Sequence, residues 1–160
     1  MYKLIALDMD GTLLRKDKTV SERTKKAIED ARKKGVTVVL ATGRPIDGVT
    51  KYLEELDMYG ENDYVLSYNG GLVLKTKNRE PICKIGLTGE DLHYLYEISK
   101  ELGVNIHAFS ETKGLITPKN SKYTEVEANI NNIKINIEDF NKLEKDHSII
   151  KIMMIDEEEV

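Results

Sequence analysis

Several residue types are rare or missing in this sequence. It has no tryptophan, two phenylalanines, three prolines and a single cysteine. Cys83 cannot form an internal disulfide, which suits a reducing cytoplasm, and we expect it to be a small buried residue in a strand. No apolar run approaches the length of a membrane span, and residues 4–7 are too few for a secretory signal. We therefore expect a soluble cytoplasmic protein.

Neither sign of charge dominates the chain. The 28 acidic and 24 basic residues give a net charge of −4, whereas a nucleic-acid-binding protein usually has a basic face. His93, His107 and His147 lack the spacing of metal ligands, so we expect them to be structural or surface residues. The composition predicts a globular protein without a nucleic-acid partner.

The first half of the chain alternates between apolar runs and helical patterns. The predicted strands, each buried on both faces of a parallel sheet, are residues 3–7, 36–41 and 64–68. Between them, Ser21 is a candidate helix N-cap and Gly35 a helix stop, and Pro45 suits the first turn of a second helix. This order is typical of right-handed βαβ units, so the predicted fold class is α/β.

Beyond residue 72 the pattern becomes α+β. The expected elements are a hairpin of residues 72–74 and 82–85, a capped helix from Thr88, antiparallel strands at 104–108 and 114–117, helices at about 123–130 and 137–145, and a strand at 149–155. We therefore predict two parts, residues 1–81 and residues 82–160.

All three predicted parallel strands end in polar, glycine-containing turns: Asp8–Thr12, Thr42–Arg44 and Asn69–Gly71. Ligands of such sheets bind outside the carboxyl ends of the strands, so we expect the turns to converge there. Asp8 and Asp10 are close enough to raise each other's pKa unless something cationic joins them, and Mg²⁺ suits their oxygen atoms. A carboxylate held in this way can attack a phosphoryl group while its neighbour transfers protons.

Each turn also has a plainer interpretation. A bare pair of acids could equally be solvated loop residues, but the buried strand before Asp8 and the Gly-Thr after Asp10 favour a site. Thr42, Gly43 and Arg44 offer a hydroxyl, a flexible amide and a cation to a phosphate, although Thr42 could simply cap a helix with Arg44 at the surface. For Asn69–Gly71 a mere turn is as good an interpretation as a substrate contact.

Three segments together carry a family resemblance. Residues 8–14 (DMDGTLL), 41–44 (ATGR) and 68–71 (YNGG) resemble the haloacid dehalogenase superfamily, and more narrowly its Cof-type sugar-phosphate phosphatase branch. The resemblance is close over residues 1–80. It implies a Mg²⁺-dependent phosphomonoester hydrolase that forms an aspartyl-phosphate and acts on sugar phosphates or other small phosphorylated metabolites.

The resemblance also implies roles for individual residues. Asp8 would be the nucleophile and a metal ligand, and Asp10 the general acid/base that gives its backbone carbonyl to the metal. The phosphate would be held by the backbone of Met9 and by Thr42 and Gly43. Arg44 and Asn69 would lie on the substrate side.

Spacing places the remaining parts. Only 33 residues separate Asp8 from Thr42, so a cap domain cannot lie between them and must follow the third strand, from about residue 82. The family's lysine and its late acidic motif are not found, since Gly60–Asp63 precedes a strand instead of following one. We therefore expect an N-terminal portion of a longer phosphatase, with the C-terminal core part missing and little activity of its own. Its incomplete sheet suggests self-association or a complementing chain.

Two alternatives remain open. A phosphomutase of the same superfamily would pass the phosphoryl group on, although the resemblance implies that Thr12, in place of an apolar residue after Gly11, favours hydrolysis. A non-catalytic remnant would bind phosphate or a partner without turnover.

Overall fold

The computed structural model describes residues 2–157, and the chain divides into two compact units between Lys84 and Ile85. The sequence-based boundary lies after residue 81, a little earlier, because the strand that ends at Lys84 pairs within the first sheet. Within the described residues, no helix is both long and apolar enough to cross a membrane.

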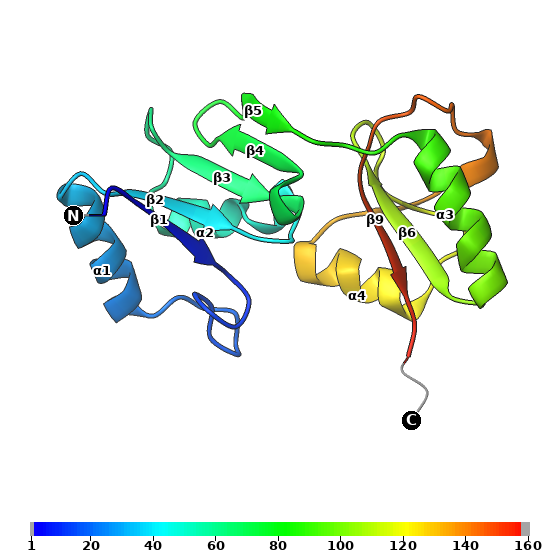
Figure 1. The fold of residues 1–160 in the computed structure, drawn as a ribbon. Helices are drawn as coiled ribbons and strands as arrows, with labels where there is room; N and C mark the ends of the chain where they lie inside the picture. Colours follow the sequence, from blue (N-terminus) through cyan, green and yellow to red (C-terminus); the bar gives the residue numbers. More distant parts are fainter. Residues whose placement is uncertain (1, 158–160) are drawn as a thin grey trace. The chain divides into compact units, whose positions relative to one another are not determined.

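The first unit is built on a five-stranded sheet in the order β1-β2-β3-β4-β5. Its strands are β1 (Leu4–Asp8), β2 (Thr37–Ala41), β3 (Tyr64–Ser67), β4 (Leu72–Lys75) and β5 (Pro81–Lys84). The first three run parallel and the last two form an antiparallel hairpin, as Figure 1 shows. The predicted α/β class and the predicted hairpin are confirmed.

The helices of this unit begin and end where the sequence indicates. In α1 (Glu22–Lys33), the Ser21 hydroxyl accepts a hydrogen bond from the amide of Thr24, and Gly35 takes a φ of 78° just beyond the helix. Pro45 precedes a short 3-10 turn, Ile46–Gly48, which leads into α2 (Thr50–Glu55). The second predicted helix is therefore shorter and less regular than its apolar pattern suggests.

Both helices pack on the same face of the sheet. The two crossovers step in one direction along the sheet, so their right-handed sense brings α1 and α2 to one side. Ile28 of α1, Leu40 of β2 and Leu53 of α2 belong to that core. On β1, however, Leu4 is 58% exposed, and the strand lies at an edge of the sheet. The prediction that this strand is buried on both faces is wrong for the described unit.

The second unit is a four-stranded sheet in the order β8-β7-β6-β9 with two helices. Its elements are α3 (Gly89–Leu102), β6 (Asn105–Ser110), β7 (Gly114–Thr117), α4 (Lys122–Asn131), β8 (Ile135–Ile137) and β9 (Ile149–Ile155). The predicted cap of α3 is present, because the side chains of Thr88 and Asp91 each bond the other's main-chain nitrogen. Leu92, Ile106 and Phe140 form part of the core.

Two local predictions are wrong. The expected helix at 137–145 is absent: Ile137 pairs with Thr117 in parallel strands, and only the 3-10 turn Phe140–Lys142 follows. Pairing with β7 keeps residues 135–137 extended, so no helix begins at Ile137. Cys83 does lie in a strand, but it is exposed, because β5 is the other edge of its sheet.

Candidate functional site

The carboxyl ends of β1, β2 and β3 border a pocket of about 360 Å³. The register aligns Asp8 with Ala41 and Ala41 with Leu66, so these residues occupy the same level of the sheet. The pocket is lined by Asp8, Ala41, Thr42, Gly43, Leu66, Asn69 and Gly70. The three polar turns therefore meet at this edge, as the topology predicted.

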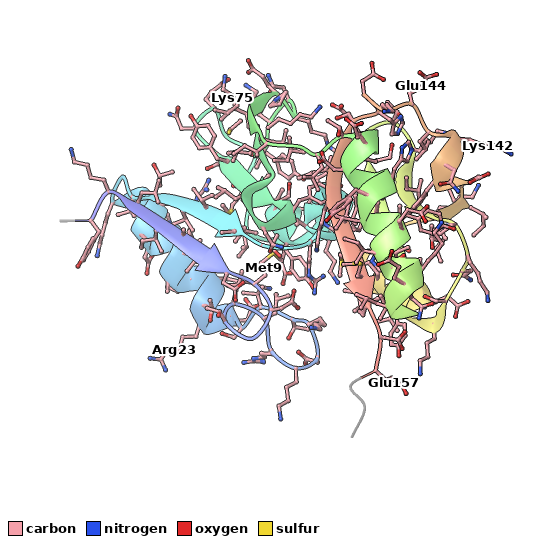
Figure 2. All side chains as sticks on the ribbon, turned by 45° about the vertical axis from the view of Figure 1, so that its right-hand side comes forward. Met9, Arg23, Lys75, Lys142, Glu144 and Glu157 are labelled. Carbon is pink, nitrogen blue, oxygen red and sulfur yellow. The ribbon has the colours of Figure 1, made fainter. Side chains whose placement is uncertain are left out.

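Asp8 is the last residue of β1 and is exposed. The Thr12 hydroxyl donates a hydrogen bond of 2.8 Å to one of its carboxylate oxygens, Oδ2. The backbone turns sharply at Gly11, where φ is 85°, and the amide of Leu14 donates to the carbonyl of Met9 at 2.8 Å. The Met9 side chain is fully buried and anchors the turn; Figure 2 labels it beyond the end of β1. Asp8 thus offers a carboxylate to the pocket from a fixed backbone.

Asp10 is held by two cations. The Nε and Nη2 atoms of Arg44 donate to the two oxygens of Asp10, each at 2.7 Å, and Lys18 Nζ lies 2.7 Å from Asp10 Oδ1. The hydrogen bonds from Arg44, more than those from Lys18, hold the pKa of Asp10 well below its usual range, although partial burial opposes them. In this arrangement Asp10 is an ionised carboxylate at neutral pH.

The same contact places Arg44 differently from the sequence-based expectation. Arg44 is only 6% exposed. Its guanidinium faces Asp10, and its Nη1 atom lies 3.5 Å from the Gly48 carbonyl oxygen. The bond with Asp10 raises the pKa of Arg44. Arg44 is therefore neither a surface residue nor a cation open to a phosphate, but a partner of Asp10.

The second and third turns are tied together by their main chains. The amide of Asn69 donates to the carbonyl of Thr42 at 2.9 Å, and the amide of Tyr68 donates to the carbonyl of Arg44 at 3.1 Å. Tyr68, Asn69 and Gly70 have φ values of 52°, 58° and 88°. Consecutive left-handed residues are costly unless the surroundings hold them, so Asn69–Gly71 is more than a simple surface turn. The hydroxyl of buried Thr42 accepts from the Arg44 amide at 3.2 Å and so orders its own loop instead of capping a helix.

The oxygen atoms that could hold a metal are few. Among residues 2–157, no group of three or more histidine, cysteine or acidic side chains is placed to bind one. The exposed Asp8 carboxylate lines the pocket and is chemically suited to be one oxygen ligand of Mg²⁺, which commonly retains water and phosphate oxygens for the others. The side chain of Asp10 does not fit this role, because two cations already occupy its oxygens.

Two residues that were not singled out in the sequence belong to the site. Lys18 bonds Asp10 from a loop, and the Tyr52 hydroxyl donates to the Lys18 carbonyl at 3.1 Å. Tyr52 is visible in the sequence only as an apolar position of α2. The lysine follows Asp10 by eight residues in an irregular segment, so no periodicity marks it.

The site and the fold together define a class of protein, and comparison with known proteins identifies it. A family model described as haloacid dehalogenase-like hydrolase matches residues 5–160, and the chain belongs to that family.

Named relatives of this family resemble most of the chain. It is 42% identical over 161 residues to a Bacillus subtilis protein named "Putative phosphatase YxeH", covering 99% of this chain and 59% of the relative. It is 32% identical over 123 residues to the HMP-PP phosphatase of Yersinia pestis, covering 75% of this chain and 42% of that protein.

A solved structure agrees in fold. A haloacid dehalogenase-like hydrolase from Bacteroides thetaiotaomicron has a TM-score of 0.75 at 31% identity, covering 88% of this chain and 53% of the other. A HAD subclass IIB sugar phosphatase shares the fold with a TM-score of 0.74 at 23% identity, covering 94% and 57%. The matched region thus spans 59% of the Bacillus subtilis relative and 53% and 57% of the two solved structures, somewhat more than half of each.

Proposed function

We propose that the pocket at the carboxyl edge of the first sheet is the phosphoryl-acceptor site of a phosphomonoester hydrolase, with Asp8 as the nucleophile. One observation carries the proposal: an exposed carboxylate at the end of a parallel strand lines the same pocket as Thr42, Gly43 and Asn69. Main-chain amides and side-chain donors in such turns suit the oxygens of a phosphate.

The reaction would proceed in two displacements. An oxygen of Asp8 attacks phosphorus, the bond from phosphorus to the ester oxygen breaks, and the leaving oxygen takes up a proton to become an alcohol. Water then attacks the phosphorus of the aspartyl-phosphate, gives up a proton, and releases inorganic phosphate and the original carboxylate. The Thr12 hydroxyl, 2.8 Å from Asp8 Oδ2, orients the carboxylate so that its other oxygen can attack.

Asp10 would move the protons. Bound to Arg44 and Lys18 it is ionised, which is the form that accepts a proton from water in the second displacement. Donation to the leaving oxygen in the first displacement requires the protonated form, so a bound ester has to weaken one of these ion pairs. Lys18, whose side chain is 50% exposed, is the partner free to move.

Mg²⁺ would be held by the Asp8 carboxylate and the Asp10 carbonyl. When bound, it would offset the negative charge of the phosphate and of the attacking carboxylate. The residues of the chain itself would supply the nucleophile, the proton acceptor and the hydrogen-bond donors to the phosphate.

The substrate class is a small phosphorylated metabolite, and sugar phosphates are our first choice. The named relatives support small molecules in general: one is an HMP-PP phosphatase, and another, 41% identical over 68 residues, is named as a phosphatase of 5-amino-6-(5-phospho-D-ribitylamino)uracil. The ribityl phosphate in that name is a phosphorylated sugar alcohol, which favours a polyol or sugar ester.

Fluorine NMR with beryllium fluoride tests the nucleophile without requiring turnover, because this reagent forms an acyl-phosphate-like adduct with aspartate. With Mg²⁺ present, we expect a bound fluorine signal from the wild-type chain and none from Asp8→Asn. Asp30→Asn, an exposed aspartate of α1, is the matched control and should retain the signal. A signal that persists in Asp8→Asn would rule out Asp8 as the acceptor.

The same site favours one alternative, phosphate binding without turnover. The observation behind it is the occupation of both Asp10 oxygens by cations, which leaves one side-chain carboxylate of the pair for a metal. Phosphate binding with no adduct at Asp8 would support this alternative.

A further inference from the structure

On its buried side, the Asp10 carboxylate is bound by the guanidinium of Arg44. The Nε and Nη2 atoms of Arg44 each lie 2.7 Å from a different oxygen of the carboxylate, a bidentate arrangement that fixes its plane. Arg44 itself is immobilised by burial, and its guanidinium carbon lies 5.7 Å from the centre of the Tyr52 ring.

Lys18 holds the same carboxylate from the solvent side. Its Nζ lies 2.7 Å from Asp10 Oδ1, while its backbone has a left-handed φ of 61°. That conformation is uncommon for a residue with a side chain and costs about 1 kcal/mol, so other contacts have to maintain it. One such contact is the turn in which the amide of Lys18 donates to the carbonyl of Arg15 at 2.9 Å.

Tyr52 joins the two cations. It is 1% exposed and reaches from α2 to the loop, where its hydroxyl donates to the carbonyl of Lys18 at 3.1 Å across 34 residues of sequence. Its ring lies against the guanidinium of Arg44. A single buried side chain therefore contacts both residues that bind Asp10.

We propose that Tyr52 is a positioning residue for Asp10, acting through Lys18 on one side and Arg44 on the other. The inference rests on the proposed function in one respect: the benefit of a fixed Asp10 is that it transfers protons during phosphoryl transfer. Proton transfer requires the carboxylate within hydrogen-bonding distance of the reacting oxygen, and a side chain that rotates freely spends little time there. The hydrogen bond from the Tyr52 hydroxyl to the loop backbone thus helps to fix Asp10, although Tyr52 does not contact Asp10 itself.

The rotamer of Asp10 is the quantity to measure. Three-bond couplings between Asp10 Cγ and its backbone nitrogen and carbonyl carbon, recorded by NMR on the labelled 160-residue chain, report whether χ1 is single or averaged. We expect values of one rotamer in the wild type. We expect a shift towards averaged values in Tyr52→Phe and Lys18→Met, and a return to the single rotamer in Lys18→Arg, which restores the cation.

A double variant separates this pathway from general loosening. If Tyr52 acts on the solvent side through Lys18, then Tyr52→Phe combined with Lys18→Met should average the couplings no more than Lys18→Met alone. Tyr94→Phe, at an exposed position of α3, removes a tyrosine hydroxyl elsewhere and should leave Asp10 unchanged. Unaltered Asp10 couplings in both Tyr52→Phe and Lys18→Met would overturn the proposal.

Separate measurements report on folding, on the proposed function and on the positioning of Asp10. Lys18 is half-exposed, so its two variants keep the test decisive even if Tyr52→Phe lowers stability, and the amide shifts of α1 report whether the first unit is folded. The beryllium fluoride adduct reports on Asp8, whereas the couplings report on Asp10. A missing adduct with a fixed Asp10 rejects the hydrolase alone, and an adduct with Asp10 couplings insensitive to Tyr52 and Lys18 rejects the positioning role alone.

Discussion

Gly43 and Asn69 are in such close contact that a Cβ atom on Gly43 would lie 2.7 Å from Asn69 Oδ1. Atoms of that kind do not approach so closely, so the absence of a side chain at residue 43 is what lets the Asn69 amide lie across the pocket. The left-handed backbone of Asn69, with a φ of 58°, and its hydrogen bond to the Thr42 carbonyl hold it there.

Gly43→Ala should therefore displace the Asn69 side chain from the pocket. If Asn69 donates to a bound phosphate, losing that contact to a charged group should weaken the binding of inorganic phosphate about tenfold, as measured by calorimetry. The unfolding midpoint should change little, because Asn69 is exposed and can rotate away.

The control is the Asn69→Ala background. Once the amide is removed, a Cβ at residue 43 meets no obstacle there, so Gly43→Ala should have no further effect on phosphate affinity. An undiminished effect of Gly43→Ala in that background would show that the alanine acts on the pocket by another route.

His107 should make the chain less stable in mild acid. Burial, with a smaller contribution from the charge of Lys151, lowers the pKa of His107 from 6.5 to about 4. Between those values the unfolded chain binds the proton that the folded chain excludes, so stability is full above pH 6.5 and falls as pH decreases towards 4. Across the whole interval the loss is on the order of 3 kcal/mol.

Urea unfolding at several pH values measures this effect. His107→Gln should flatten the dependence of the unfolding free energy on pH between neutrality and pH 4. Thr124→Val removes only the hydroxyl that lies 3.3 Å from His107 Nδ1, and its curve should keep the wild-type slope at a lower level. Equal slopes for wild type and His107→Gln would contradict the assignment.

The ion pair between Arg32 and Asp63 should contribute more to the unfolding free energy than the ion pairs at the surface. Arg32 donates to both oxygens of Asp63, at 2.6 and 2.9 Å, and the amide of Gly60 donates to Asp63 Oδ2 at 2.7 Å. The Asp63 side chain is only 9% exposed. Asp63→Asn should lower the unfolding free energy by about 2 kcal/mol, since it leaves the guanidinium partly buried beside a neutral group.

The matched comparison is Glu29→Gln, which breaks the exposed pair with Lys33 on the same helix. It should change stability by less than about 0.5 kcal/mol. Equal effects of the two substitutions would show that burial does not strengthen the Arg32–Asp63 contact.

The elements that could be predicted from sequence are those with local causes. Ser21 caps α1 with its own hydroxyl, and Gly35 and Gly103 end their helices with a positive φ that glycine adopts at little cost. The parallel direction of the first three strands follows from the alternation of strands and helices, and with it the meeting of Asp8 and Thr42 at one edge.

The features that could not be predicted depend on contacts distant in sequence. Arg44 could have faced solvent, and only the packed loop turns it towards Asp10. Lys18 reaches Asp10 from a left-handed backbone that Tyr52 helps to hold, and no pattern joins those two residues. Ile137 and Cys83 likewise took positions set by neighbouring strands. The roles of Asp8, Met9, Thr42 and Gly43 towards phosphate stay predictions.

Covalent trapping tests the role of Asp8 most directly. The chain is incubated with p-nitrophenyl phosphate and Mg²⁺, quenched, and reduced with borohydride, which converts a phosphorylated aspartate to homoserine that mass spectrometry can locate. We expect homoserine at residue 8 in the wild type, and none anywhere in Asp8→Asn. Homoserine at another aspartate, or a phosphoryl-enzyme that still forms in Asp8→Asn, would contradict Asp8 as the nucleophile.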